Sequence, residues 1–318
     1  MMRGVKTCLL LATVAAISGG CHGTGVAGTT VVPTAERPVV KEATREELLD
    51  AYNQIARNTK TLNATLELKP TAGSRYSGVI DEYHEVKAFL LAARPGKIRV
   101  IGQAPVIGTT VFDMASDGET FRVSVPSKNK FLVGPVGVER SSSKPIENLR
   151  PQHLLDALLW PEIRKEEAVT LREFNDEKAR YYILTVLRGG YQLEVLREIW
   201  FNRADLHVAR METYGPKGSL LSDVSLTDWE PVDNAPAQGT ITKPTAAGEA
   251  SASVMEFPRS IRIVRPHDDY QLDMQITKIT VNEEIPADRF KLEQPAGSEL
   301  VRVGEAAESK PPTESKPQ

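Results

Sequence analysis

The sequence has few cysteines, few aromatic residues and almost no net charge. Two cysteines, Cys8 and Cys21, occur among 318 residues, and Phe, Trp and Tyr make up 6% of the chain. The 39 basic and 42 acidic residues nearly cancel and form no basic stripe, which argues against nucleic-acid binding and against charge-driven docking on anionic lipid. The apolar run 9–17 is too short for a transmembrane helix, which needs about 20 residues.

The N-terminal segment has the pattern of a bacterial export signal that ends in a lipid attachment site. Arg3 and Lys6 precede the apolar run 9–17, and the small residues 18–20 lead directly to Cys21. A lipoprotein signal peptidase needs small residues before a cysteine whose thiol is acylated. We therefore predict that residues 1–20 are a lipoprotein signal peptide and that Cys21 is lipidated. An ordinary secretory signal cleaved nearby is the alternative.

Loss of residues 1–20 would leave Cys21 as the one cysteine of the mature chain, so no disulfide could form within it. A domain of this size can build its stability from a buried core. Two or three acyl chains on Cys21 would hold the chain on a membrane, since each buried CH₂ contributes ~0.8 kcal/mol. His22 stands where an aspartate retains lipoproteins at the inner membrane of enterobacteria. We predict a lipid anchor in the bacterial outer membrane, with the domain facing the periplasm.

Composition divides the mature chain into a tether, a domain and a tail. Residues 21–43 are rich in Gly, Thr, Val and Pro without a period, which suits a flexible tether from the lipidated cysteine. Residues 44–303 form the predicted domain. Within it, the Pro-, Ala-, Gly- and Thr-rich residues 233–253 predict a disordered loop insertion between two strands. Residues 304–318 are rich in Glu, Lys, Pro and Ser and predict a disordered tail.

Local patterns in the domain predict one helix followed by many strands. Thr44 and Glu47 form a capping box ahead of apolar residues at helical spacing. Asp-Gly and Gly-Gly turn signals separate later segments in which apolar and polar residues alternate. Such alternation predicts strands at residues 62–68, 121–125, 182–186 and 220–226. The expected fold is mainly β, with one strongly curved antiparallel sheet or barrel and few helices.

Residues 151–160 predict a second helix of a different kind. Pro151 suits its first turn and Pro161 ends it. The segment is apolar nearly all round, so we expect it to be buried on most sides. It either completes the core or covers the open mouth of the sheet as a lid. The lid-helix residues would be Leu154, Leu155, Leu158, Leu159 and Trp160.

Four segments, taken in order, resemble the lipoprotein-localisation family of LolA and LolB. They are Ala-Arg-Pro-Gly-Lys-Ile-Arg-Val at 93–100, Met-Ala-Ser-Asp-Gly-Glu-Thr-Phe at 114–121, Val-Asn at 281–282 and Phe-Lys-Leu-Glu-Gln-Pro-Ala-Gly at 290–297. The resemblance covers about residues 44–303. It implies an incomplete antiparallel β-barrel, closed by a few helices, whose apolar inner surface receives acyl chains of lipoproteins.

The resemblance also implies a role for Arg94. In the soluble carrier of the family, an arginine directly before this proline bonds to the lid helices and holds the barrel closed. Arg94 stands at that place and is the predicted lid latch, while an ordinary strand-end cation that reaches water is the alternative. Cys21 fits the lipidated receptor of the family better than the carrier. That receptor has an exposed leucine on a protruding loop, for which the sequence assigns no counterpart.

Periodicity predicts which strand residues line the acyl-chain cavity. The inward candidates are Leu66, Leu90, Ile98, Val100, Phe121, Val123, Leu184 and Val224. We predict a lipid-anchored envelope lipoprotein that binds acyl chains of lipoproteins or lipids and aids lipoprotein sorting to the outer membrane, with a periplasmic carrier protein as a partner. The alternative is a scaffold or sensor of the same fold that binds a protein partner. A continuous apolar pocket under residues 151–160 would favour carriage, and a barrel filled by its own side chains would favour the partner role.

Patterns for catalysis and metal binding are weak. The serines 141–143 precede His153 and Asp156, but the nucleophile elbow Gly-x-Ser-x-Gly is missing. The His-Asp-Asp run at 267–269 is typical of a tight turn, and no second His or Cys cluster accompanies it. We therefore expect no enzyme activity, no cofactor, no metal and no nucleic-acid partner.

Overall fold

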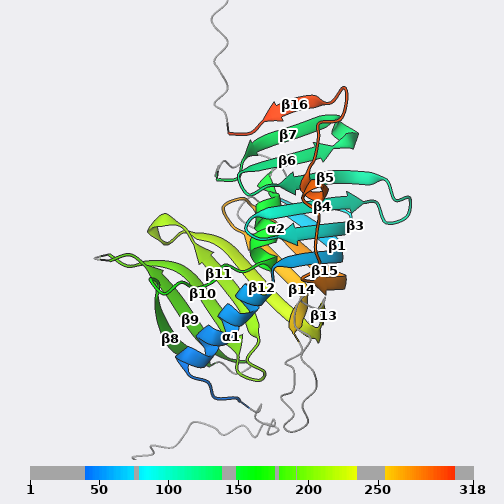
Figure 1. Cartoon of the computed structure of the whole chain (residues 1–318). Coiled ribbons are helices and arrows are strands. Elements are labelled where there is room, and N and C mark those ends of the chain that lie inside the picture. The colour runs from blue at the N-terminus through cyan, green and yellow to red at the C-terminus, as the bar shows by residue number, and fades with distance from the viewer. Residues whose placement is uncertain are drawn as a thin grey trace, which may run out of the picture. The chain divides into compact units, whose positions relative to one another are not determined.

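One continuous sheet dominates the computed structural model of the protein (Figure 1). The structure describes residues 40–74, 79–137, 148–175, 179–190, 192–234 and 255–304. Several sequence predictions therefore lie outside the described residues: the signal peptide, the lipidation site Cys21, most of the tether, the serines 141–143, nearly all of the predicted loop insertion and the tail.

Two antiparallel meanders meet in the middle of this sheet, where β1 (Thr61–Ser74) pairs with β15 (Tyr270–Val281). Outward from β1 the strands are β3 (Val86–Ala93), β4 (Lys97–Gln103), β5 (Thr110–Ser116), β6 (Thr120–Val125) and β7 (Lys130–Pro135). Outward from β15 they are β14 (Glu256–Arg265), β12 (Leu220–Pro231), β11 (Val208–Tyr214), β10 (Glu194–Asn202), β9 (Arg180–Arg188) and β8 (Ala168–Asn175).

Three short strands join this framework at its margins. β2 (Val79–Glu82) pairs with the end of β1, and β13 (Asp233–Asn234) runs parallel to β15. β16 (Glu299–Arg302) runs parallel to β7 and forms one edge of the sheet. β13 occupies the first two residues of the predicted loop insertion.

The sheet stays open, because its edge strands β8 and β16 do not pair with each other in the described part of the chain. The predicted fold class is confirmed: a mainly β protein with an incomplete antiparallel barrel and few helices. The four segments of predicted alternation lie in β1, β6, β9 and β12. Alternation predicts these strands because successive side chains of a strand point to opposite faces of the sheet, and one face of this sheet is buried.

Helix α1 (Arg45–Asn58) begins where the sequence predicts it. The Glu47 backbone N–H donates to the Thr44 hydroxyl, and the Thr44 N–H donates to the Glu47 carboxylate at 2.8 Å, so both halves of the capping box form. Leu48, Tyr52 and Ala56 are buried on the face of α1 that joins the core. Burial of this apolar stripe holds the helix in place.

Helix α2 (Pro151–Leu158) lies in the connection from β7 to β8, which are outer strands of the two meanders. It packs against β4 and β5, so the chain crosses one face of the sheet between its two halves (Figure 1). We call this the inner face. Pro151 occupies the first turn as predicted, but the helix ends at Leu158, and Leu159 and Trp160 follow it.

Short 3-10 helices that the described residues include in full lie in the connections: η1 (Pro126–Lys128), η3 (Pro216–Gly218) and η4 (Ala287–Phe290). Among the described residues, no helix is long and apolar enough to span a membrane. The buried apolar side chains of α1, α2 and both meanders form one cluster on the inner face. The core of the protein is therefore the space between the inner face and the two helices.

Candidate functional site

The inner face beneath α2 is the candidate site, and most predicted cavity residues lie there. Leu66, Leu90, Ile98, Val100 and Leu184 belong to the buried cluster and are exposed by 1% or less, and Val224 joins them. Val123 is only partly buried and packs against the margin of the cluster. Phe121 is buried outside it, under the Arg150 guanidinium, whose carbon lies 4.8 Å from the ring centre.

Side chains of α2 fill the space over this face. Leu154, Leu155 and Leu158 of the helix, together with Leu159 and Trp160 behind it, are buried in the same cluster. The two pockets described below lie elsewhere on the domain. In this state the apolar inner face is covered by the chain's own residues, so an acyl chain would need α2 to move away before it could bind there.

Arg94 holds the segment that directly follows α2. Its Nε donates to the carbonyl of Thr59 at 2.9 Å, and Nη2 donates to the carbonyl of Trp160 at 2.7 Å. The guanidinium therefore joins the end of α1 to the end of α2. Burial lowers the pKa of Arg94, yet an arginine remains charged at neutral pH. This geometry suits the predicted lid latch, whose effect on opening stays a prediction.

Three further side chains bind the same segment and were missed from the sequence. The Tyr52 hydroxyl donates to the Pro161 carbonyl at 3.0 Å, and burial raises the pKa of Tyr52 to about 12. The Asn53 amide bonds both the N–H and the carbonyl of Ile163, at 2.9 and 3.1 Å. Asn53 lies on the buried face of α1, and a buried amide needs hydrogen-bond partners, so its position in the sequence could have indicated such a contact.

The third is Arg197, on the inner side of β10. It pairs with the buried carboxylate of Glu167 at 3.3 Å and donates to the Pro161 carbonyl at 3.4 Å. Arg94, Tyr52, Asn53 and Arg197 together fix residues 160–167 by polar contacts. Helix α2 itself is held mainly by apolar contacts, whereas the segment that follows it is held by hydrogen bonds and an ion pair.

An aromatic stack continues from this segment into the second meander. Trp160 stacks on Tyr52 with ring centres 5.6 Å apart and meets Trp229 edge-on at 6.0 Å. His207 stacks on the other side of Trp229 at 4.7 Å and bonds the Glu256 carboxylate at 2.7 Å. Tyr52 and Trp160 fill the interior, while Trp229 and His207 are partly exposed at its margin.

The suspected catalytic residues of α2 serve packing and local hydrogen bonds. Nδ1 of His153 shares a hydrogen bond with the Tyr270 hydroxyl, and burial lowers the pKa of His153 well below its usual value. The Gln152 amide donates to Asp156 at 3.2 Å. The run at 267–269 lies at the turn between β14 and β15, where Arg265 pairs with Asp268 at 2.8 Å. The described residues hold no group of three or more acidic, His or Cys side chains arranged for a metal ion.

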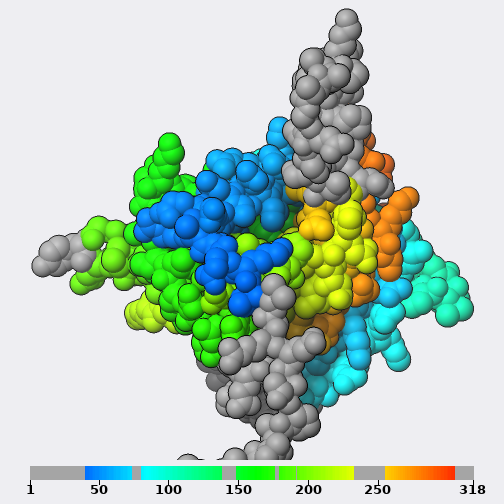
Figure 2. All heavy atoms as spheres, turned by 90° about the horizontal axis from the view of Figure 1, so that it is seen from below, coloured from blue at the N-terminus to red at the C-terminus, as the bar shows by residue number. Residues whose placement is uncertain are grey.

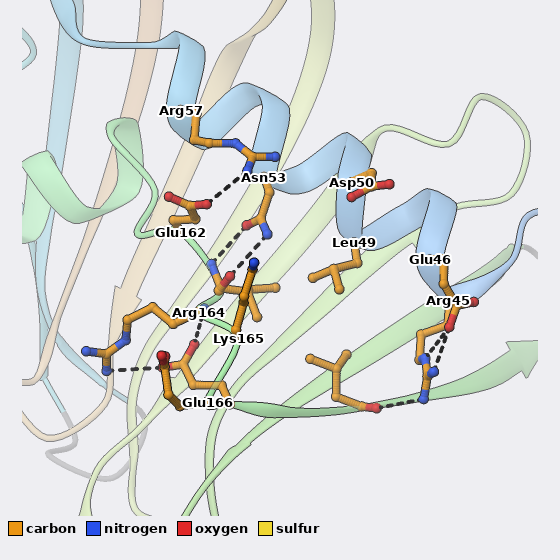
Figure 3. A pocket seen from close by; sticks show the side chains of 13 residues that line it. Arg45, Glu46, Leu49, Asp50, Asn53, Arg57, Glu162, Arg164, Lys165 and Glu166 are labelled. Carbon is orange, nitrogen blue, oxygen red and sulfur yellow. Dashed lines mark hydrogen bonds and ion pairs between the residues drawn. The ribbon is translucent and has the colours of Figure 1, made fainter.

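An open groove of about 670 Å³ lies between α1 and residues 162–169 (Figure 3). Leu49, Ile163 and Val169 supply its apolar lining. Charged side chains surround them, and many are already paired: Arg57 with Glu162 at 3.2 Å, and Arg164 with Glu167 at 3.5 Å. The groove borders the edge strand β8, so it is accessible without any movement of α2.

A protruding loop carries the most exposed large apolar side chains among the described residues. Residues 104–109 join β4 to β5, and within them Val106 is 95% and Ile107 77% exposed. The loop projects from the sheet at the right in Figures 1 and 2. Sequence reasoning missed it, because a short Pro-Val-Ile-Gly run reads equally well as part of a strand.

The fold and site define a class of protein: an open antiparallel half-barrel whose apolar inner face is covered by a helix. No protein-family model matches the chain, and the comparison with curated proteins finds no match. Several solved structures are similar to it at low identity.

Three of them show the range of the likeness. A LolA superfamily protein from Nitrosomonas europaea is 13% identical with a TM-score of 0.43, over 79% of this chain and 99% of that chain. A DUF1329 family protein from Desulfovibrio piger is 12% identical with a TM-score of 0.48, over 76% and 94%. An outer membrane lipoprotein-sorting protein domain from Vibrio parahaemolyticus is 10% identical with a TM-score of 0.42, over 76% and 95%. At such values the likeness says nothing about what this chain binds.

Proposed function

We propose that the protein is a lipid-anchored envelope lipoprotein that binds an acyl chain of a lipid or lipoprotein on the inner face of its half-barrel, without chemistry, and so aids lipoprotein sorting to the outer membrane. The observation that carries this proposal is α2. An eight-residue helix covers an apolar face, and a cation binds the carbonyl at its end. Acyl methylenes would replace the leucines of α2 on that face.

The free energy lost when α2 leaves the inner face is similar to the free energy gained when an acyl chain binds there. Each buried leucine of α2 contributes ~1.5–3 kcal/mol to the closed state, and an acyl chain that takes the same place restores apolar burial at a similar free energy per unit area. The polar contacts of Arg94 set the remaining cost of opening. Observed affinity would then depend on how often α2 leaves the inner face.

Release needs a competing apolar environment, and the loop 104–109 is suited to reach one. Val106 and Ile107 present apolar side chains to solvent at its tip, where burial in a bilayer would be favourable. A lipid anchor on Cys21 would keep the domain at the membrane surface. In this proposal a periplasmic carrier protein supplies cargo, and the loop brings the half-barrel to the bilayer that accepts it.

The anchor and the cargo can be tested together with the variant Cys21→Ser. We expect it to lose covalent acylation and to appear in the soluble or unprocessed fraction, because Cys21 is the thiol that the lipid transferase would use. Native mass spectrometry of this soluble full chain should still detect lipid bound without a covalent bond. Cys8→Ser is the matched control and should be acylated like the wild type. Palmitate incorporation into Cys21→Ser, or a soluble chain free of lipid, would contradict the anchor or the cargo respectively.

The second candidate function is binding of a protein partner. It is favoured by the side chains of α2, which fill the space over the inner face. If α2 never leaves the inner face, the groove between α1 and residues 162–169 is the accessible site (Figure 3). Its apolar floor and charged rim are typical of surfaces that bind a protein segment. Charge reversal at Lys165 would then weaken partner capture, whereas acyl binding on the inner face would be unaffected.

A further inference from the structure

A second pocket lies on the outer face of the sheet, on the opposite side from α2. It has a volume of about 260 Å³. Phe89 and Leu91 of β3 and Ile101 of β4 point outward into it, between the buried residues Leu90 and Val100 that point to the core. Phe89 is 41% exposed. An aromatic ring left in water on an outer face is a marker of a binding surface when other apolar and polar groups converge on it.

One wall of this pocket is formed by residues 289–291, which Arg99 holds against β4; we call these contacts the Arg99 clamp. Arg99 of β4 forms a bidentate pair with Asp113 of β5, with nitrogen–oxygen distances of 3.1 and 2.8 Å. Its remaining nitrogen donates to the carbonyls of Arg289 and Lys291, each at 3.1 Å. Each nitrogen of the Arg99 guanidinium therefore donates a hydrogen bond, and those to Arg289 and Lys291 hold η4 and the following residue against β4. Asp113 neutralises the charge of Arg99.

The clamp leaves Arg289 as the free cation of the pocket. Its guanidinium has no ion pair or hydrogen bond within the described part of the chain, although it lines the pocket. No carboxylate belongs to the lining; Glu283, which accepts from the Asn63 amide at 3.2 Å, lies at the side. The Gln103 side chain adds a neutral amide. In a chain of net charge −3, a pocket with one unpaired cation and no carboxylate in its lining is locally positive.

We propose that this outer pocket binds the carboxylate end of a single-chain fatty acid. The planar guanidinium of Arg289 matches a carboxylate with two parallel hydrogen bonds. Phe89, Leu91 and Ile101 receive the first methylenes. The volume is smaller than the ~300–1,000 Å³ of pockets that enclose a whole drug-sized ligand, so it admits one chain and not the two chains of a phospholipid. This site is separate from the inner face and does not depend on movement of α2.

The test compares laurate with dodecanol, which has the same chain and no charge, by titration calorimetry on the full chain in a Cys21→Ser background. We expect laurate to bind and Arg289→Gln to weaken it by about tenfold or more, with no change in dodecanol affinity. Lys291→Gln is the matched control, because it removes the same charge two residues away from a side chain that does not line the pocket. It should bind laurate like the wild type.

Two further variants keep the outcome clear. Ile101→Ser should weaken laurate and leave the fold intact, since this side chain is only partly buried on the outer face. Arg94→Leu, which acts on the inner face, should leave the laurate effect of Arg289 unchanged. Absence of laurate binding, or equal laurate affinity in the wild type and Arg289→Gln, would overturn the proposal. Equal laurate affinity in the wild type and Arg289→Gln would not bear on acyl binding beneath α2, whereas absence of all laurate binding would count against both sites.

Discussion

Replacing Arg94 by leucine should raise the affinity of the half-barrel for an acyl chain by about tenfold. The variant loses two charge-assisted hydrogen bonds, to the carbonyls of Thr59 and Trp160. Such bonds contribute ~1.5–3 kcal/mol when well formed, and partial exposure of Arg94 reduces this toward the lower value, near the 1.4 kcal/mol that corresponds to tenfold. The closed state loses this free energy and the open state does not, so the binding-competent population grows.

Titration with a fluorescent acyl probe that carries no charge measures this effect without involving Arg289. Lys97→Leu is the matched control, because Lys97 lies on the same hairpin, loses the same charge, and its side chain forms no hydrogen bond or ion pair among the described residues. It should bind the probe like the wild type. Equal probe affinity in Arg94→Leu and the wild type would mean that Arg94 supports the structure without governing access.

Trp160→Ala should cause the largest loss of stability of any substitution considered for this chain, about 3–5 kcal/mol of the free energy of unfolding. The indole is buried between Tyr52 and Trp229, and its Nε1 donates to the Ala157 carbonyl at 3.0 Å. The substitution leaves a cavity where the end of α2, α1 and the second meander meet. Chemical denaturation followed by circular dichroism measures the loss.

Trp200→Ala provides the comparison. Trp200 lies on the outer face of β10 between the guanidinium groups of Arg172 and Arg210, at 5.7 and 5.3 Å from the ring centre, and is only partly buried. Its loss removes stacking without emptying the core, so the decrease should be clearly smaller. Equal losses in the two variants would show that the stack around Trp160 contributes no more than an outer-face ring.

Local signals made much of the fold predictable. The capping box at Thr44 and Glu47 acts within four residues, and Pro151 and Pro161 bracket α2 in the same local way. Alternation of apolar residues identified strands at residues 62–68, 121–125, 182–186 and 220–226. The prediction therefore succeeds for elements and for their burial, as the near-zero exposure of Leu66, Ile98 and Leu184 illustrates.

Features set by contacts between distant segments were not predictable in this way. Phe121 has the right period for the inner cavity, yet β6 lies far enough out in the sheet for its ring to pack under Arg150 instead. The sequence predicts that Arg94 bonds to the lid helix but not that it binds the carbonyl of Trp160, because that residue is 66 positions away along the chain. The outer pocket needs residues 289–291 to reach Arg99, a separation of 190 residues along the chain.

The central claim is that an acyl chain can take the place of α2 on the inner face, and photo-crosslinking tests it most directly. The probe is a palmitoyl phospholipid with a diazirine at the end of one chain, mixed with the full chain and mapped by peptide mass spectrometry. We expect attachment to inner-face residues such as Leu66, Val100 and Leu184, with a higher yield in Arg94→Leu than in the wild type. Attachment confined to outer-face residues in both proteins, or no attachment, would contradict it.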